Sequence, residues 1–153
     1  FDIDAFIVRP FNNYGPRQPI SINEIGVIPK TIKRIYANKS PIIYGDGKQE
    51  RDFIFVKDTV NYVVNVFTKV PPGDEINICS NNPIRIRKLI EIIKEITKTK
   101  IKISFKKKRI ADVYSHHGNN KKLKKIIKLK KNNFKKNMME TINFYMKYLK
   151  NEK

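Results

Sequence analysis

The chain has 153 residues, of which 40% are hydrophobic, and it carries 33 Lys and Arg against 14 Asp and Glu, a formal net charge of +19. This length fits one domain with a modest core, and no apolar run approaches the roughly 18 residues that a membrane-spanning helix requires. The single cysteine, Cys79, excludes an internal disulfide and a cysteine-based zinc site, and it suits a reducing compartment. We therefore expect a cytoplasmic protein without a membrane partner.

The positive charge is concentrated in the C-terminal part of the chain. Residues 1–84 carry ten Lys and Arg against nine Asp and Glu, whereas residues 85–153 carry 23 against five. Lys, Asn and Ile are abundant there, and their A/T-rich codons mean that base composition alone would produce the excess. We favour solvated Lys faces over a functional basic patch, although either would give a diffuse affinity for nucleic acid at low salt.

Strands and helices are expected to alternate along the chain, which predicts the α/β class. The first apolar run predicts a strand at residues 4–9, followed by a polar loop at 10–25. Apolar spacing and turn-forming residues predict the later elements. In chain order these are a helix from 26 to 39, strands at 41–44 and 52–56, a helix from 58 to 67, a strand at 75–79, a helix through 86–96, a strand at 100–105, a short helix at 119–127 and a last helix through 138–149. The residues assigned to the buried face of the second helix are Val60, Val63, Val64 and Phe67.

Polar clusters follow several predicted strands, at the place where open α/β sheets bind ligands. The first strand runs into Arg9-Pro-Phe-Asn-Asn-Tyr-Gly-Pro-Arg17-Gln18, and its Gly-Pro pair prevents a helix from starting. The other clusters are Tyr44-Gly45 with Arg51-Asp52, Asn77 with Ser80–Asn82, and Arg109. Amides, Arg forks and an aromatic face suit a ligand with phosphates, hydroxyls and a planar base. Turn chemistry and a surface pair between Arg51 and Asp52 would explain any one cluster, but their recurrence favours the ligand.

Three further patterns argue against other sites. Gly45-Asp-Gly47 has Glu50 where a third glycine of a phosphate-binding fingerprint would stand. The sole Tyr-x-x-x-Lys, from Tyr44 to Lys48, spans two glycines and therefore cannot form a catalytic couple on one helix face. The adjacent His116-His117 would diverge on a regular element without an acidic or Cys partner, so we expect no metal site.

Four segments, in order, resemble the C-terminal half of the extended short-chain dehydrogenase/reductase family, the NAD-dependent nucleotide-sugar epimerases, dehydratases and decarboxylases. The segments are Arg9–Arg17, similar to the strand-to-substrate-loop motif; Gly45–Asp58, similar to GDGxQxRDFxxVxD; Glu75–Ser80, similar to xxNIGS; and Arg109–Val113 with Asn119 and Lys122, similar to RPGDV…ADxxK. The resemblance covers essentially the whole chain. It implies the last strands of an NAD(P)-binding, Rossmann-like domain together with the small α/β substrate-binding domain.

The resemblance also implies how the chain divides. Residues 1–9 and about 52–70 would belong to the Rossmann core, and about 10–50 and 71–153 mainly to the substrate cap. The family's Gly-rich NAD loop and its catalytic Tyr-x-x-x-Lys with a Ser or Thr would lie upstream, in a part absent from this sequence. We therefore expect that NAD is mostly bound elsewhere, that this chain alone has no turnover, and that it exposes a strand edge and apolar helix faces. The family suggests a homodimer for the full-length protein.

The roles of individual residues follow from the resemblance alone. Arg51 and Arg109 would clamp the diphosphate of a UDP- or dTDP-linked sugar, and Tyr44 would stack on the base. The residues beside the nicotinamide would be Pro10 and Phe11. The remaining substrate-binding residues would be Asn12 at the diphosphate, Val27, Ile28 and Pro29 in the nucleotide pocket, Asn77 near the nucleotide and His116 near its sugar. The chain departs from the family pattern at Cys79, where Gly is usual, at Ala111, which replaces the Gly of RPGD, and at Gly118-Asn119, which replaces Ala-Asp.

Two alternatives remain open at this stage. The chain would also fit a non-catalytic, truncated remnant of the same fold. It would further fit a basic nucleic-acid-binding module, with Phe134 and Tyr145 available for stacking. Both aromatics fall on the apolar stripe of a predicted helix, where we expect core packing instead.

Overall fold

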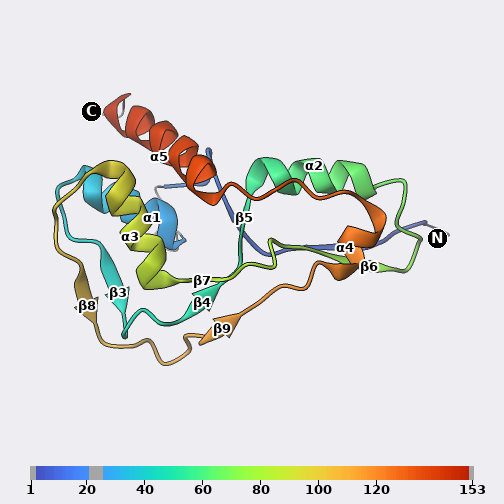
Figure 1. The fold of residues 1–153 in the computed structure, drawn as a ribbon, viewed down its shortest axis with the longest axis horizontal. Coiled ribbons are helices and arrows are strands. Elements are labelled where there is room, and N and C mark those ends of the chain that lie inside the picture. The colour runs from blue at the N-terminus through green and yellow to red at the C-terminus, as the bar shows by residue number, and fades with distance from the viewer. Residues whose placement is uncertain (1–2, 21–25, 152–153) are drawn as a thin grey trace.

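Short parallel strand pairs are spread along the length of the fold and alternate with helices, which confirms the α/β class (Figure 1). The computed structural model describes residues 3–20 and 26–151. The three parallel pairs are β1 (Ile7–Pro10) with β6 (Glu75–Ile78), β2 (Asn12–Tyr14) with β5 (Phe53–Phe55), and β3 (Ile42–Tyr44) with β8 (Ser104–Lys106). A fourth sheet places β4 (Glu50–Arg51) between antiparallel β7 (Ile84–Arg85) and parallel β9 (Ser115–His116).

The helices divide between the two ends of this strand arrangement. They are α1 (Val27–Tyr36), α2 (Val56–Val66), α3 (Ile86–Thr97), α4 (Lys121–Ile126) and α5 (Phe134–Asn151). Figure 1 shows α1, α3 and α5 gathered near β3 and β8, whereas α2 and α4 lie toward the opposite end with β6. In the described part of the chain, no helix combines the length and the apolar character that a membrane span requires.

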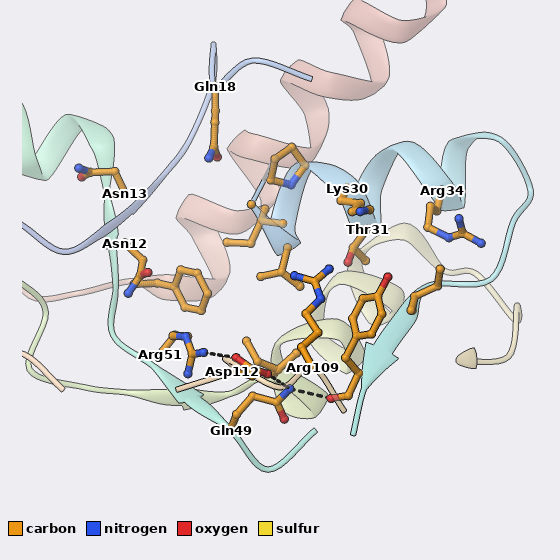
Figure 2. Close-up of a pocket in the computed structure, with 18 residues that line it drawn as sticks. Asn12, Asn13, Gln18, Lys30, Thr31, Arg34, Gln49, Arg51, Arg109 and Asp112 are labelled. Carbon is orange, nitrogen blue, oxygen red and sulfur yellow. Dashed lines mark hydrogen bonds and ion pairs between the residues drawn. The ribbon is translucent and has the colours of Figure 1, made fainter. Parts of the chain in front are cut away.

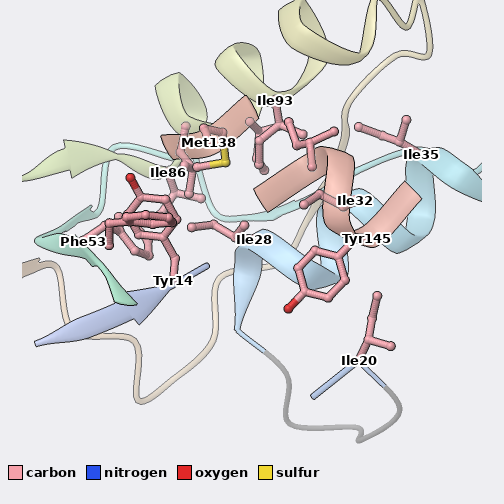
Figure 3. Packing of buried hydrophobic residues seen from close by; sticks show 14 of the residues in the cluster. Tyr14, Ile20, Ile28, Ile32, Ile35, Phe53, Ile86, Ile93, Met138 and Tyr145 are labelled. Carbon is pink, nitrogen blue, oxygen red and sulfur yellow. The ribbon is translucent and has the colours of Figure 1, made fainter. Parts of the chain in front are cut away.

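The larger hydrophobic cluster lies between α1, α3 and α5 (Figure 3). Ile32 on α1, Ile93 on α3 and Met138 on α5 are each fully buried in it. Tyr145 is buried in the same cluster, and Phe134 packs against it partly buried. These two aromatics are therefore core residues, which removes the stacking platform that the nucleic-acid interpretation needs.

A smaller cluster packs α2 and α4 against the β1–β6 pair. Its fully buried members include Val66, Ile78 and Leu123. The prediction for the buried face of α2 is wrong: Val60 is 57% exposed and Val64 and Phe67 are each 69% exposed. The residues that turn inward instead are Thr59, Tyr62 and Val66, with Val63 half-buried beside them.

The rotation of α2 has a local cause. The helix begins at Val56, directly after β5 ends at Phe55. Because no turn separates the two elements, the position of β5 fixes which side of α2 faces the core. Tyr62 and Val66 then face β6, and the more apolar stripe is left outside. On the neighbouring strand, Ile7 is 56% exposed as well.

Several short strands differ from the sequence prediction. The predicted loop at 10–25 contains β2, whose polar Asn-Asn-Tyr sequence carries no strand signal and which exists because it pairs with β5. The predicted strand at 100–105 begins only at Ser104, where β8 pairs with β3. The two-residue strands β4, β7 and β9 were not predicted, because only pairing between distant segments defines them. Residues 21–25 of the predicted loop lie outside the described residues.

Candidate functional site

A cavity of about 530 Å³ lies beside the start of α1 (Figure 2). Its walls come from the first turns of α1, the beginning of β2, the ends of β3 and β4, and the turn at residues 109–112. Seven of the eleven predicted site residues line it: Asn12, Val27, Ile28, Pro29, Tyr44, Arg51 and Arg109. Segments up to about a hundred residues apart in sequence therefore meet at one place.

Strand ends and a tight turn position the aromatic and cationic side chains. Tyr44 and Arg51 each end a short strand, β3 and β4. The turn between the strands needs glycine at Gly45 and Gly47, whose φ values are 73° and 77°. At Gly47, a Cβ would also lie 2.9 Å from Arg87 Cβ, so the close approach of α3 excludes a side chain there.

Arg51 is held by a carboxylate from the opposite wall. Its Nη2 lies 2.6 Å from Asp112 Oδ1, and its Nη1 donates to the Glu50 carbonyl at 2.8 Å. The amide of Gln49 links the same carboxylate, at 3.2 Å, to the Tyr44 carbonyl, at 2.8 Å (Figure 2). The two charged side chains are only 19% and 18% exposed, so their ion pair is less screened than a surface pair. The interpretation of Arg51 and Asp52 as a surface pair is therefore wrong.

Arg109 contacts the aromatic ring of the site. Its guanidinium carbon lies 4.0 Å from the centroid of the Tyr44 ring, a cation–π geometry. The guanidinium favours the phenolate by hydrogen bonding and by charge, and it thereby lowers the pKa of Tyr44. Lys30 and Arg34 on α1 also line the cavity, so its lining carries four cationic side chains against the one carboxylate of Asp112.

Asp52 occupies the junction between the loops around the site. The side chain is fully buried, and its Oδ1 accepts from the Ser80 N–H at 3.0 Å and from the Ser80 hydroxyl at 2.6 Å. Its Oδ2 accepts from the N–H groups of Asn81, at 2.9 Å, and Gly118, at 3.2 Å. The Asp52 carbonyl accepts from Asn12 Nδ2 at 2.9 Å. The buried carboxylate thus joins the loops that follow β6 and β9, and the backbone carbonyl of the same residue holds Asn12.

Four of the predicted site residues lie outside the cavity lining. His116 stacks on Phe11 with ring centroids 4.9 Å apart, and its Nδ1 lies 3.3 Å from Asn12 Nδ2. Pro10 ends β1 and Asn77 lies in the paired strand β6, one register position away. These four residues therefore form a separate group at the carboxyl ends of β1, β6 and β9, joined to the cavity through Asn12.

Sequence reasoning missed several cavity residues. They are Gln18, Lys30, Thr31, Arg34, Gln49 and Asp112, whereas Asn13 belongs to the first predicted polar cluster and also lines the cavity. Two of them, Gln49 and Asp112, belong to the same sequence motifs as Arg51 and Arg109. These motifs could therefore have identified both residues as candidates for the site. Lys30 and Arg34 are four residues apart on α1 and share a helix face, which the spacing alone would have indicated.

Two departures from the family pattern meet in space. A Cβ built at Gly118 would lie 2.3 Å from Cys79 Cβ, well inside any permitted contact. The resemblance implies the larger residue at position 118 and the smaller at 79, and this chain has the reverse. In either arrangement one side chain fills the space where the loops after β6 and β9 meet. In this chain that side chain is Cys79, which is 1% exposed.

No group of three His, Cys, Asp or Glu side chains could hold a metal ion within residues 3–20 and 26–151. The cavity lining offers guanidinium groups, side-chain amides and an aromatic face. Such a set suits anionic and planar groups.

Comparisons with known proteins identify the family to which the chain belongs. Residues 1–79 match the model of the NAD dependent epimerase/dehydratase family. A UDP-N-acetyl-alpha-D-glucosaminuronate decarboxylase of Bacillus cytotoxicus is 36% identical over 63% of this chain and 30% of its own length. A mouse dTDP-D-glucose 4,6-dehydratase is 34% identical over 62% of this chain and 27% of its own length.

Solved structures extend the match along the chain. The UDP-N-acetylglucosamine 4-epimerase from Methanobrevibacter ruminantium, in complex with UDP-N-acetylmuramic acid, superimposes with a TM-score of 0.90 and 31% identity. The match covers 95% of this chain and 47% of that one, so the chain spans less than half the length of each of these three relatives. The chain belongs to the NAD-dependent epimerase/dehydratase family of extended short-chain dehydrogenases/reductases.

Proposed function

We propose that this chain is the substrate-binding part of an NAD-dependent epimerase or dehydratase and binds a UDP- or dTDP-linked sugar. The observation that carries the proposal is that one cavity joins the Tyr44 ring, Arg51 and Arg109. Its volume of about 530 Å³ lies within the range of roughly 300–1,000 Å³ that small-molecule sites occupy. The net positive lining favours a ligand with the charge of a diphosphate.

Each wall of the cavity suits one part of such a ligand. The Tyr44 ring would stack on the base, and Arg51 and Arg109 would clamp the diphosphate. The apolar first turn of α1, with Val27, Ile28 and Pro29, would cover the nucleoside, and Asn12 would bond a phosphate oxygen. His116 and Asn77 would lie toward the sugar end. The relatives support this choice, because one solved relative holds a UDP-sugar and another is named for a dTDP-sugar.

We also propose a division of labour around NAD. Residues 1–9 and about 52–70 would complete a cofactor domain, with Pro10 and Phe11 beside the nicotinamide, while the rest of the chain holds the substrate. Phe11 is half-buried and stacked on His116, an arrangement that could border a planar ring. When bound, NAD would supply transient oxidation of the sugar to a keto form. The apolar side chains that α2 leaves exposed, Val60, Val64 and Phe67, would pack against the cofactor-binding part.

This division predicts binding without turnover. Tyr44 and Lys48, the sole Tyr-x-x-x-Lys pair, flank a turn with two positive-φ glycines and not a helix. The general base and the Gly-rich cofactor loop would therefore have to come from another part of the enzyme. A coupled assay that detects epimerase or dehydratase activity from this chain alone would overturn this half of the proposal.

Calorimetric titration with UDP, dTDP and UDP-glucose tests the binding half. We expect saturable binding that Arg51→Ala weakens about ten- to a hundred-fold, because a buried guanidinium–phosphate contact is lost. The matched control is Arg87→Ala, which removes an exposed arginine paired with Glu91 on α3 and should leave binding unchanged. Equal affinity for any polyanion, abolished by moderate salt, would instead favour a basic nucleic-acid-binding module.

A further inference from the structure

The two cavity arginines are held in different ways. Arg51 is fixed by the Asp112 carboxylate and the Glu50 carbonyl. Arg109 makes no ion pair among the described residues, and its guanidinium rests on the Tyr44 ring. Arg109 lines the same cavity as Thr31 on α1 and the Arg51–Asp112 pair (Figure 2). The guanidinium therefore occupies space inside the cavity, over the aromatic face.

A base and this guanidinium cannot occupy the same face of one ring. At 4.0 Å from the centroid, the guanidinium already lies at stacking distance, so a base can reach this face only if Arg109 leaves it. Phosphate offers Arg109 a stronger, charge-assisted partner than the ring does. A nucleoside without phosphates offers no such exchange.

We propose that Arg109 is a specificity-determining residue that covers the base-stacking face of Tyr44 until a diphosphate draws it away. The inference rests on the proposed function of the cavity. It makes base binding and diphosphate binding cooperative, because the group that blocks one subsite is the ligand of the other. The site thereby binds nucleosides weakly for two reasons: the Arg109 guanidinium competes with the base for the Tyr44 ring, and a nucleoside makes no phosphate contacts.

The size of the effect follows from the contacts exchanged. A cation–π contact at a partly exposed site should weaken nucleoside binding about two- to five-fold. A guanidinium–diphosphate contact should strengthen nucleotide binding about ten- to a hundred-fold. Removing Arg109 should therefore change the two affinities in opposite directions, which simple loss of a binding residue would not do.

The test compares wild type, Arg109→Ala and Arg51→Ala against uridine, UMP and UDP, and against thymidine, dTMP and dTDP, by calorimetry. For Arg109→Ala we expect weaker UDP or dTDP binding and nucleoside binding about two- to five-fold tighter. For Arg51→Ala, whose partners are Asp112 and the Glu50 carbonyl and not the Tyr44 ring, we expect weaker diphosphate binding without the gain in nucleoside affinity that Arg109→Ala gives. Nucleoside affinity that falls or stays constant in Arg109→Ala would overturn the inference while leaving the proposed function intact.

A second measurement uses the unmodified chain and so does not depend on how a variant folds. Inorganic diphosphate should draw Arg109 from the ring and raise the affinity for uridine or thymidine about two- to five-fold in wild type. The same addition should have no effect in Arg109→Ala. Absence of this cooperativity in a wild-type protein that binds UDP or dTDP would overturn the inference, and failure of both nucleotides to bind would overturn the proposed function with it.

Discussion

The two hydrophobic clusters differ in how completely they cover their helices. In the cluster of α1, α3 and α5, the apolar face of α3 is fully buried: Leu89, Ile90 and Ile93 are each 0% exposed. In the cluster of α2 and α4, α2 buries one face and leaves Val64 and Phe67 each 69% exposed on another. The cavity thus lies beside a helix whose apolar face is fully buried, whereas α2 presents apolar side chains to solvent.

The joint between the two regions is the buried group around Asp52. Its carboxylate ties the loop after β6 to Gly118, and Gly118 in turn lies against Cys79. Because Asp52 directly follows Arg51, this joint also sets where the strand that carries the cavity arginine ends. The two regions should therefore differ in stability, and they are coupled both through this joint and through β5, which contributes Phe53 to the larger cluster and Ile54 to the smaller.

The largest effect should come from the closed core. Ile93→Ala removes fully buried atoms and should lower the free energy of unfolding by about 2–5 kcal/mol. The matched substitution Val64→Ala, on the exposed face of α2, should change it by no more than about 0.5 kcal/mol. Urea denaturation of both variants measures the two losses in free energy of unfolding. Similar losses would contradict the claim that the two regions differ in how completely they bury their apolar side chains.

A smaller effect should appear at the joint. Gly118→Ala places a Cβ against Cys79 and should cost about 1–3 kcal/mol through overpacking. Adding Cys79→Gly restores the space, so the double variant should lose less than the sum of the two single losses. The coupling energy from the double-mutant cycle, expected at about 1 kcal/mol or more, is the measured quantity. Additive losses would show that the two positions do not compensate each other.

The mildest test leaves the sequence unchanged and probes the Cys79 thiol. Burial, and then the nearby Asp52 charge, raise the pKa of Cys79 from 9.0 to about 11. At pH 8 the thiolate fraction should therefore be about a hundred-fold smaller than that of an ordinary thiol. Iodoacetamide should alkylate the native chain at least that much more slowly than the same chain in urea, with a rate that still rises above pH 9. A plateau near pH 9 would mean that the joint is open to solvent.

The same shift predicts how stability depends on pH. The unfolded thiol ionises at a lower pH than the folded one, so the folded state holds more protons between pH 9 and about 11. Stability should accordingly fall as pH rises through that window. The fall should be smaller in Cys79→Ala, which lacks the thiol, and what remains above pH 10 should come from buried tyrosines such as Tyr145, whose pKa burial raises to about 12.

Much of the fold could be predicted because its signals are local. Ile86, Leu89, Ile90 and Ile93 repeat at helical spacing and are all buried on α3. The strand at Glu75–Ile78 alternates as predicted. The signals failed where another segment decides the outcome, as for β2, which is polar and ordered by β5. They failed again for α2, which has two possible buried faces. Only the direct connection from Phe55 decides which of the two faces the core.

The sequence by itself determined the family and the residue types of the cavity, because its four motifs occur in order and bring Tyr44, Arg51 and Arg109 with them. Only the tertiary structure decided which partners these residues have. Arg51 pairs with Asp112, 61 positions away, and not with the adjacent Asp52, which is buried among backbone N–H groups. Arg109 lies over Tyr44, 65 positions away. Such contacts depend on how the ends of distant strands are placed relative to one another. A local sequence pattern contains no information about that placement.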